Sequence, residues 1–269
     1  MSKLGERYAR ALVTGAGSGL GKAFAEALIG EGIAVWGTSR QPDKLMVSDQ
    51  FTGVKLDLAE NFDLQSWYNR TDTESGGFDL VINNAGFATF GQADKMAATD
   101  VEKQVKVLLT GPIQLSVAAI GLMRDRGHGC LVNISSVASE LWIPYMPVYN
   151  ATKAGLSVFS QSMMLEAPDR PPWIIDFRPG DYRTAFNQHM RKHLGDNSSS
   201  QRVWQRLQQI MEKSPPPTQA AKDLLSSLRQ FRHCTRYSGS FFQSSIAPLA
   251  SRLFSNALNR GVLRRYFNL

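Results

Sequence analysis

The chain has 269 residues, 43% of them hydrophobic, and a net charge of +7, so it carries enough apolar material for one sizeable core. It has no run of about 18 apolar residues to predict a membrane span, and its N-terminus, MSKLGERYAR, lacks the apolar stretch of a signal peptide. Two cysteines and four histidines without metal-ligand spacing predict no disulfide framework and no metal site, so we expect reduced thiols in a cytoplasmic protein.

The first two thirds of the chain alternate apolar runs with amphipathic stretches. In chain order we predict strand 9–15, helix 20–32, strands 33–40 and 53–58, helix 61–72, strand 78–86, helix 99–126, strand 128–136, helix 148–167 and strand 171–180. The apolar runs do not alternate with polar residues, which is typical of a parallel sheet buried on both faces. Right-handed crossovers then give a doubly wound α/β Rossmann fold with three layers, α/β/α.

Beyond Gly180 the periodicity weakens. We predict helix over 184–213, a helix opened by prolines over 214–228, a short strand at 235–240 and an amphipathic stretch over 244–268. No linker or internal repeat separates these pieces. The sequence therefore predicts a single domain over 1–269, with a substrate lid at 185–215 and a C-terminal extension at 216–269.

A glycine-rich turn, TGAGSGLG at 14–21, follows the first predicted strand and opens the first predicted helix. Glycines let the backbone turn sharply and approach a pyrophosphate, while the helix N-terminus presents free N–H groups to the anion. The spacing G-x-G-x-x-G is absent, because a leucine stands at position 20. The predicted dinucleotide contacts in this turn are Gly15, Ser18, Gly19, Leu20 and Gly21.

The second predicted strand ends in Ser39 and Arg40, where a dinucleotide site reads the ribose. An acidic residue there would favour a free 2′-hydroxyl, but this chain has none. A guanidinium can pair with a 2′-phosphate. Arg40 could also be an ordinary surface arginine, although its position at the strand end favours the phosphate. We predict NADP(H) as the cofactor.

Six motifs stand in the order and spacing of one family across roughly the first 185 residues. They are TGAGSGLG (14–21), LDL (56–58), NNAG (83–86), NISS (133–136), YNATK (149–153) and RPGDYRT (178–184). With these motifs the chain resembles the short-chain dehydrogenase/reductase family. The resemblance implies a homodimer or homotetramer built by the long helices 99–126 and 148–167.

The resemblance also implies roles for individual residues. Tyr149 would be the general acid or base, Ser136 would hydrogen-bond the substrate carbonyl oxygen, and Lys153 would hold the nicotinamide ribose hydroxyls. Beyond the glycine turn, Ser39 and Arg40, the implied cofactor contacts are Asp57, Leu58, Asn83, Ala85, Gly86, Tyr149, Lys153, Pro179, Gly180 and Thr184.

The residue types fit this chemistry on their own. Tyr149 and Lys153 are four residues apart on one predicted helix, so their side chains face the same way. A free phenol has a pKa of about 10, and a nearby ammonium together with an oxidised nicotinamide ring would push that pKa toward neutrality. An isolated Tyr–Lys pair would indicate a helix surface, but Ser136 and the glycine turn favour catalysis here.

One position departs from the family's pattern. The helix asparagine that anchors a water in the family's proton relay is replaced by Leu108, in KVLLTGPIQL. Gln104, one turn earlier on the same face, is a hypothetical substitute. We favour the view that hydride transfer and proton donation survive on Ser136, Tyr149 and Lys153 alone.

The segment VASELWIPYMPV, 137–148, is predicted to line an apolar, aromatic substrate pocket. Trp142 and Tyr145 in this segment, and Phe186 in the lid, are predicted substrate contacts. His189 and Met190 are further candidates, with His189 as a bystander rather than a catalyst.

Basic residues concentrate in the C-terminal third. Residues 1–182 carry 16 Lys+Arg against 20 Asp+Glu, and residues 183–269 carry 14 against 3. Such asymmetry is typical of proteins that bind an acidic partner, a phosphorylated substrate or an anionic membrane. A solvated cationic face is the preferred alternative. For residues 241–269 we favour core completion or dimer packing over contact with a membrane surface. Nucleic acid is not an expected partner, because no recognition module accompanies the charge.

These patterns predict an NADPH-dependent oxidoreductase that reduces a ketone of an apolar or aromatic substrate, or runs the reverse reaction. One alternative is a reductase of 3-oxoacyl thioesters, with the basic C-terminal third receiving an acidic carrier protein. Another is a cofactor-binding regulator with weakened catalysis, which Leu108 suggests and the intact set of Ser136, Tyr149 and Lys153 argues against.

Overall fold

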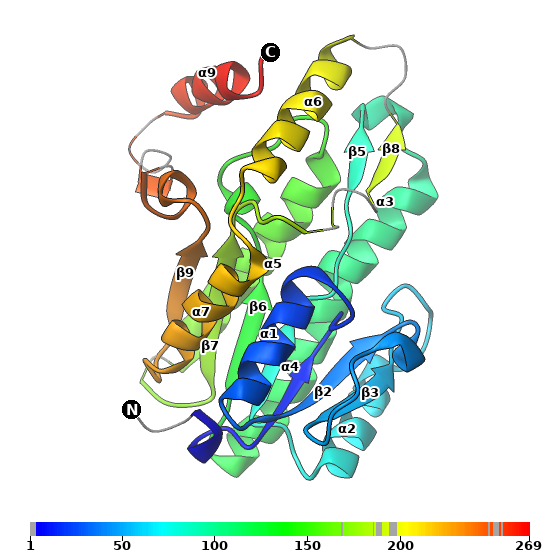
Figure 1. The fold of residues 1–269 in the computed structure, drawn as a ribbon, viewed down its shortest axis with the longest axis vertical. Helices are drawn as coiled ribbons and strands as arrows, with labels where there is room; N and C mark the ends of the chain where they lie inside the picture. Colours follow the sequence, from blue (N-terminus) through cyan, green and yellow to red (C-terminus); the bar gives the residue numbers. More distant parts are fainter. Residues whose placement is uncertain are drawn as a thin grey trace.

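The computed structural model describes residues 4–167, 169–184, 186, 190–193, 198–246, 248–249, 253 and 255–269. Its centre is a seven-stranded sheet in the order β3-β2-β1-β4-β6-β7-β9 (Figure 1), and all six pairings are parallel. The strands are β1 (Arg10–Val13), β2 (Ala34–Ser39), β3 (Phe51–Lys55), β4 (Leu80–Asn83), β6 (Cys130–Ile134), β7 (Trp173–Pro179) and β9 (Cys234–Ser238). The predicted doubly wound parallel sheet is confirmed.

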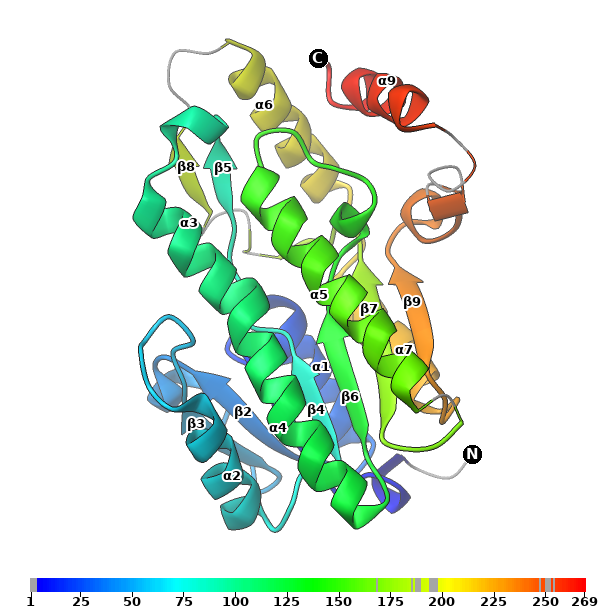
Figure 2. The same cartoon turned by 180° about the vertical axis from the view of Figure 1, so that it is seen from behind.

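Helices cover both faces of this sheet (Figures 1 and 2). One face carries α1 (Gly19–Gly30) and α7 (Pro217–Leu228), and the other carries α2 (Leu64–Ser75), α4 (Gly111–Arg126) and α5 (Pro147–Glu166). Successive strand side chains point to opposite faces. In β1, Ala11 and Val13 therefore join the core under α1 and α7, whereas Leu12 joins the core under α2 and α4.

The predicted helix 99–126 is one continuous helical run with an irregular middle. It consists of α3 (Ala98–Val105), a π-helical turn (Lys106–Thr110) and α4. With a mean hydropathy of 1.6 over its most apolar window, Ala98–Arg126 is long and apolar enough to span a membrane, a test that the core helix of a soluble protein also passes. Half of that window is buried inside the protein, so contact with the sheet explains its apolar character.

The predicted helix 184–213 is wrong in its first half. Residues Arg191–His193 form strand β8, which pairs in parallel with β5 (Thr89–Gly91), and among the residues of this range that the structure describes only those of α6 (Ser198–Glu212) are helical. The Asp100 carboxylate accepts hydrogen bonds from Arg191 and His193, which ties β8 to α3. Local periodicity cannot show this strand, because its partners lie about a hundred residues earlier in the chain.

The C-terminal segment leaves the sheet after β9 and continues through a π-helical turn (Phe242–Ile246) to α9 (Asn256–Tyr266). Both views place α9 beside α6, beyond the end of the sheet (Figures 1 and 2). The Arg206 Nε donates to the Tyr266 carbonyl oxygen at 3.1 Å. Phe267 packs in a third buried cluster with Trp204 and Leu207 of α6. The predicted short strand at 235–240 is confirmed as β9.

Candidate active site

A cavity of about 750 Å³ opens at the carboxyl ends of the strands. Gly15 follows β1, Asn84 follows β4, Ser135 follows β6 and Gly180 follows β7, and all four line this cavity. The strand order reverses direction between β1 and β4. Doubly wound sheets bind ligands at such a reversal, because the connections leave the sheet in opposite directions there and open a crevice.

The predicted cofactor contacts gather in this one cavity. Fifteen of the seventeen line it, and the exceptions are Gly21 and Asn83. A methyl group at Gly19 would lie 3.6 Å from Thr184, so the segment after β7 comes close to the glycine turn. Asp57 and Leu58 contribute from the segment after β3.

Backbone conformation explains the glycines of the turn. Gly15 and Gly19 have φ angles of 69° and 55°, a region that side chains with a Cβ atom rarely adopt. Gly21 is needed for a different reason, since a methyl group there would lie 2.2 Å from the Gly15 carbonyl oxygen. Gly21 therefore allows α1 to start directly against the turn. It does not line the cavity, and its role as a cofactor contact stays a prediction.

The assignment of Asn83 to the cofactor floor is also wrong. Its amide Nδ2 donates to Asn133 Oδ1 at 2.8 Å and to Ser116 Oγ at 3.0 Å, on the α4 side of the sheet. The next residue, Asn84, lines the cavity and donates from Nδ2 to the Thr14 carbonyl oxygen at 2.9 Å. Because side chains alternate along a strand, an error of one residue changes the face.

Gly86 and Leu108 meet at the cavity wall. A methyl group at Gly86 would lie 2.7 Å from Leu108 Cδ2, so the leucine fills the space beside the glycine. Leu108 stands in the π-helical turn, is buried and lines the cavity. Gln104 is buried as well, and its Nε2 has no hydrogen-bond partner among the described residues. Gln104 does not line the cavity, and its role as a water anchor stays a prediction.

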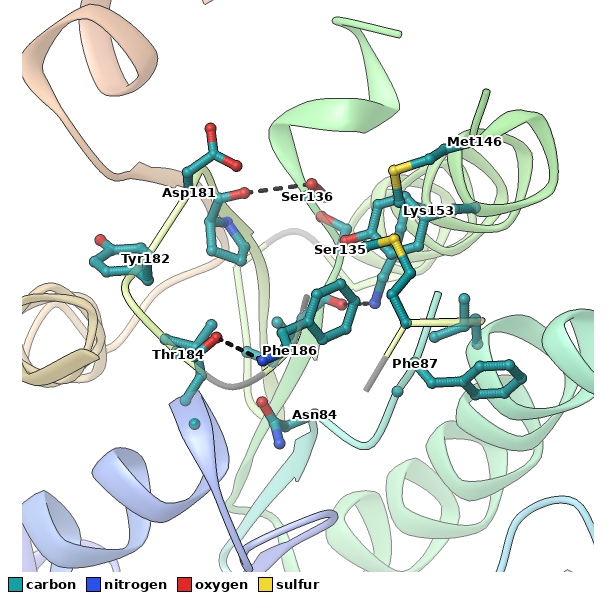
Figure 3. Close-up of a pocket in the computed structure, with 18 of the residues that line it drawn as sticks. Asn84, Phe87, Ser135, Ser136, Met146, Lys153, Asp181, Tyr182, Thr184 and Phe186 are labelled. Atoms are coloured by element: carbon teal, nitrogen blue, oxygen red, sulfur yellow. Dashed lines mark hydrogen bonds between the residues drawn. The ribbon is translucent and has the colours of Figure 1, made fainter. Parts of the chain in front are cut away.

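The three predicted catalytic residues line the same cavity, with Ser136 just after β6 and Tyr149 and Lys153 one turn apart on α5. Figure 3 shows Ser136 and Lys153 in this cavity. Lys153 Nζ donates to the Ile134 carbonyl oxygen at 2.7 Å and lies 5.9 Å from the centre of the Tyr149 ring. Ser136 Oγ accepts from the Ala138 N–H at 3.0 Å and donates to the Pro179 carbonyl oxygen at 3.3 Å.

The environment moves the two titratable groups in opposite directions. Burial raises the pKa of Tyr149 to about 12, against a lowering effect of its hydrogen bond with Ser136. Burial lowers the pKa of Lys153 to about 8, partly offset by the charge of Asp176. The expected acidification of the phenol is therefore not produced by the chain itself, because desolvation outweighs the stabilising contacts of the phenolate. Tyr149 is held protonated, in the form that donates a proton.

Of the three predicted substrate contacts, one lines the cavity and two do not. Phe186 lines the cavity with its ring centre 6.2 Å from that of Tyr149. Trp142 lies outside the cavity and is 38% exposed, while Tyr145 packs on Phe90 at 5.6 Å between ring centres, outside the cavity as well. Neither side chain lines the cavity in this structure, and their roles as substrate contacts stay predictions. His189 lies outside the described residues.

The segment 137–148, predicted to line an apolar pocket, contributes Val137, Leu141, Ile143 and Met146 to the cavity wall. Met190, a predicted candidate for substrate contact, lines the cavity. Helix α6, the π-helical turn Phe242–Ile246 and α9 add side chains that were not named individually. These added side chains are Leu207, Met211, Phe242, Val262, Leu263 and Tyr266. Leu207 and Met211 lie within the predicted lid, 185–215, and the other four lie within 241–269, for which core completion or dimer packing was favoured. The nucleotide end of the cavity also includes Lys103 of α3, a second cation in addition to Arg40.

Comparison with known proteins gives consistent matches. The family model described as short chain dehydrogenase matches residues 9–195. A 3-ketodihydrosphingosine reductase of Bacteroides thetaiotaomicron is 29% identical over 204 residues, which cover 75% of this chain and 75% of that protein. An uncharacterised oxidoreductase of Schizosaccharomyces pombe is 30% identical over 184 residues, covering 66% of this chain and 62% of that protein.

Solved structures share the fold. A short-chain dehydrogenase from Streptomyces avermitilis aligns with a TM-score of 0.79 at 25% identity, over 96% of this chain and 95% of that one. A short-chain dehydrogenase/reductase from Burkholderia phymatum in complex with NAD gives 0.76 at 22% identity, over 94% of both chains. A short-chain dehydrogenase from Sphingobium yanoikuyae in complex with NADPH gives 0.70 at 20% identity, also over 94% of both chains.

Proposed function

Because the chain belongs to the short-chain dehydrogenase family, we propose that it is an NADPH-dependent oxidoreductase that reduces the ketone of an apolar substrate to an alcohol. One observation carries the proposal. Ser136, Tyr149 and Lys153 line the same cavity as the glycine turn at one end and an apolar wall at the other. That arrangement brings a proton donor, an oxyanion hydrogen bond and a dinucleotide site within reach of one substrate carbonyl.

The residues at the nucleotide end fit a dinucleotide. Gly15 and Gly19 hold the left-handed conformations of a tight turn, and α1 begins at that turn. Arg40 lines the cavity at the end of β2 and forms no ion pair with any residue that the structure describes. A guanidinium without a carboxylate partner is free to take a 2′-phosphate, which supports NADPH over NADH.

The chain's own residues perform the proton chemistry. When bound, NADPH supplies the hydride. As charge develops on the carbonyl oxygen, Tyr149 donates its phenolic proton and Ser136 Oγ donates a hydrogen bond to the same oxygen. A phenol is a much stronger acid than the aliphatic alcohol formed, so this transfer runs downhill even with the raised pKa of Tyr149. Lys153, protonated below a pKa of about 8, supplies the nearby positive charge.

The wall of the cavity supports an apolar substrate. Phe186, Met190 and Leu207 line the cavity, with further aromatic and aliphatic side chains from α9. The relative from Bacteroides thetaiotaomicron is named for the reduction of 3-ketodihydrosphingosine, a long-chain 2-amino ketone. We therefore propose a ketone that carries a long apolar chain.

A homodimer through the two long helices is part of the proposal. Val117 on α4 is 56% exposed, and Val158 and Leu165 on α5 are 65% and 82% exposed. Large aliphatic side chains spread over adjacent helices are typical of a surface that packs against a second copy.

The proposal is tested by NADPH oxidation over a panel of ketones of graded chain length, with 3-ketodihydrosphingosine among them and Tyr149→Phe as the control. We expect turnover that rises with chain length and is lost in the control. Tight NADPH binding without oxidation of any ketone would instead indicate a regulator. Activity only on ketones attached to a carrier protein would indicate a 3-oxoacyl thioester reductase.

A further inference from the structure

Exposed large apolar side chains are concentrated in the last 29 residues, 241–269, the C-terminal segment. Fourteen such side chains are exposed in the part of the chain that the structure describes, and eight of them lie in this segment. They are Phe241, Phe242, Ile246, Leu249, Leu253, Leu258, Val262 and Leu269. A water-soluble protein rarely exposes so many together, and such a patch marks a surface that meets an apolar partner.

This apolar patch reaches the rim of the cavity. Phe242 and Val262 line the cavity and are nevertheless 45% and 49% exposed. The Phe242 ring stacks on Tyr266, another lining residue, with ring centres 6.1 Å apart and planes 17° apart. On α9, Leu258 lies one turn from Val262 on the same face, so the exposed patch continues outward from the cavity rim.

Positive charge accompanies the patch. Arg260, Arg264 and Arg265 are exposed on α9, and none forms an ion pair with a described residue. The sequence has no aspartate or glutamate after Asp223, so the segment carries no acidic residue to neutralise them. Helix periodicity places Arg265 on the face of Leu258 and Val262. A helix with exposed apolar side chains and unpaired arginines has the composition of an interfacial helix.

We propose that the C-terminal segment docks on the surface of an anionic phospholipid bilayer, with the mouth of the cavity toward the lipid. The side chains of Phe241, Leu258 and Val262 enter the boundary between head groups and acyl chains, and Arg265 on the same face of α9 contacts a lipid phosphate. Arg260 and Arg264 lie roughly opposite that face and add to the positive potential of the segment. This docking goes beyond the proposed reductase activity and does not depend on it. If both hold, a lipophilic ketone passes from the bilayer into the cavity without crossing water.

The charge of the segment argues against two other partners for the apolar patch, a second copy of the chain and an acidic protein. In a twofold contact between copies the same patch meets itself, which would bring the arginines of one α9 near those of its partner with no carboxylate in either segment. An acidic protein would neutralise the arginines but leaves the exposed apolar side chains unexplained. An anionic bilayer satisfies both the charge and the apolar surface.

The test is sedimentation of the full-length protein with vesicles of phosphatidylcholine alone or with 30% phosphatidylglycerol. We expect at least tenfold tighter binding to the anionic vesicles, weakened by salt. The double variant Phe241→Glu/Leu258→Glu should reduce this binding at least tenfold. The control variant Val47→Glu should not, because Val47 is 98% exposed just before β3, at the opposite edge of the sheet from β9. Arg260→Gln/Arg264→Gln/Arg265→Gln should remove the preference for anionic lipid. Neither Phe241 nor Leu258 lines the cavity, so their variant should keep its NADPH oxidation on a short, water-soluble ketone.

Equal binding to both vesicle types, or binding unaffected by the Phe241/Leu258 variant, would overturn the proposal. The same holds if that variant changes a dimer into a monomer in light scattering while the wild type ignores vesicles, because the patch is then a contact between copies. Loss of all ketone reduction in the wild type contradicts the proposed function and leaves the vesicle result standing. Thermal unfolding of each variant separates lost binding from lost folding.

Discussion

Gly21→Ala tests the packing of the dinucleotide turn. The added methyl group would lie 2.2 Å from the Gly15 carbonyl oxygen and 2.4 Å from Asn84 Nδ2, far inside van der Waals contact. The first neighbour is a backbone atom, so the start of α1 must move by about 1 Å. A displacement of that size in a reacting geometry lowers the reaction rate on the order of 100-fold. Overpacking of this kind lowers the free energy of unfolding by about 1–3 kcal/mol, which changes the folding equilibrium constant roughly 5- to 150-fold.

Gly30→Ala in the same helix is the matched control. A methyl group at Gly30 has no atom within 4 Å, and replacing a helical glycine by alanine stabilises by about 0.5–1 kcal/mol. Fluorescence titration with NADPH and thermal unfolding measure the two effects. We expect Gly21→Ala to weaken NADPH binding at least fivefold and lower the Tm, and Gly30→Ala to do neither. NADPH affinity equal to that of the wild type in Gly21→Ala would refute the reasoning.

Four further predictions follow from the site and the surface. Burial lowers the pKa of Lys153 to about 8, so kcat/KM for ketone reduction should hold below pH 8 and fall above it as the ammonium loses its proton; a profile flat to pH 10 would contradict this. Arg40→Leu should lower the preference for NADPH over NADH roughly 10- to 150-fold, the value of a charge-assisted hydrogen bond of about 1.5–3 kcal/mol, measured as the ratio of the two kcat/KM values. Leu108→Asn should leave kcat within about twofold of the wild type, because we expect the proton relay not to limit turnover; a large rise in kcat would show that it does. Val158→Glu/Leu165→Glu should turn a dimer into a monomer in light scattering, and an unchanged mass would place the interface elsewhere.

Much of the fold and of the nucleotide end could be predicted because their signals are local. The glycine turn, Ser39–Arg40 and the Tyr149–Lys153 pair each lie within a few residues of one strand or helix end, and the sheet brings those ends together. The error between Asn83 and Asn84 shows the limit. Both lie in the predicted strand 78–86, and the alternation of side chains along it decides which one faces the cavity. The strand is apolar and buried on both faces, so its pattern does not show which residue that is.

The substrate end could be predicted only in part, because beyond 137–148 and the lid it is assembled by contacts between distant segments. Phe242 and Val262 reach the rim only because α9 packs near α6, and strand β8 forms only because β5 is available a hundred residues earlier. Tyr145 has a positive φ of 62° and packs on Phe90 instead of lining the cavity, which no pattern in VASELWIPYMPV indicates. Loop paths of this kind are set by packing rather than by local propensity.

The most direct test of the central claim is single-turnover hydride transfer in Tyr149→Phe, alongside the equilibrium affinity for NADPH. If Tyr149 is the proton donor, the transfer rate should fall by about 10²–10⁴-fold while the Kd for NADPH stays within about twofold of the wild type. A variant that transfers hydride at the wild-type rate would show that another group protonates the ketone oxygen, and the role given to Tyr149 would be wrong.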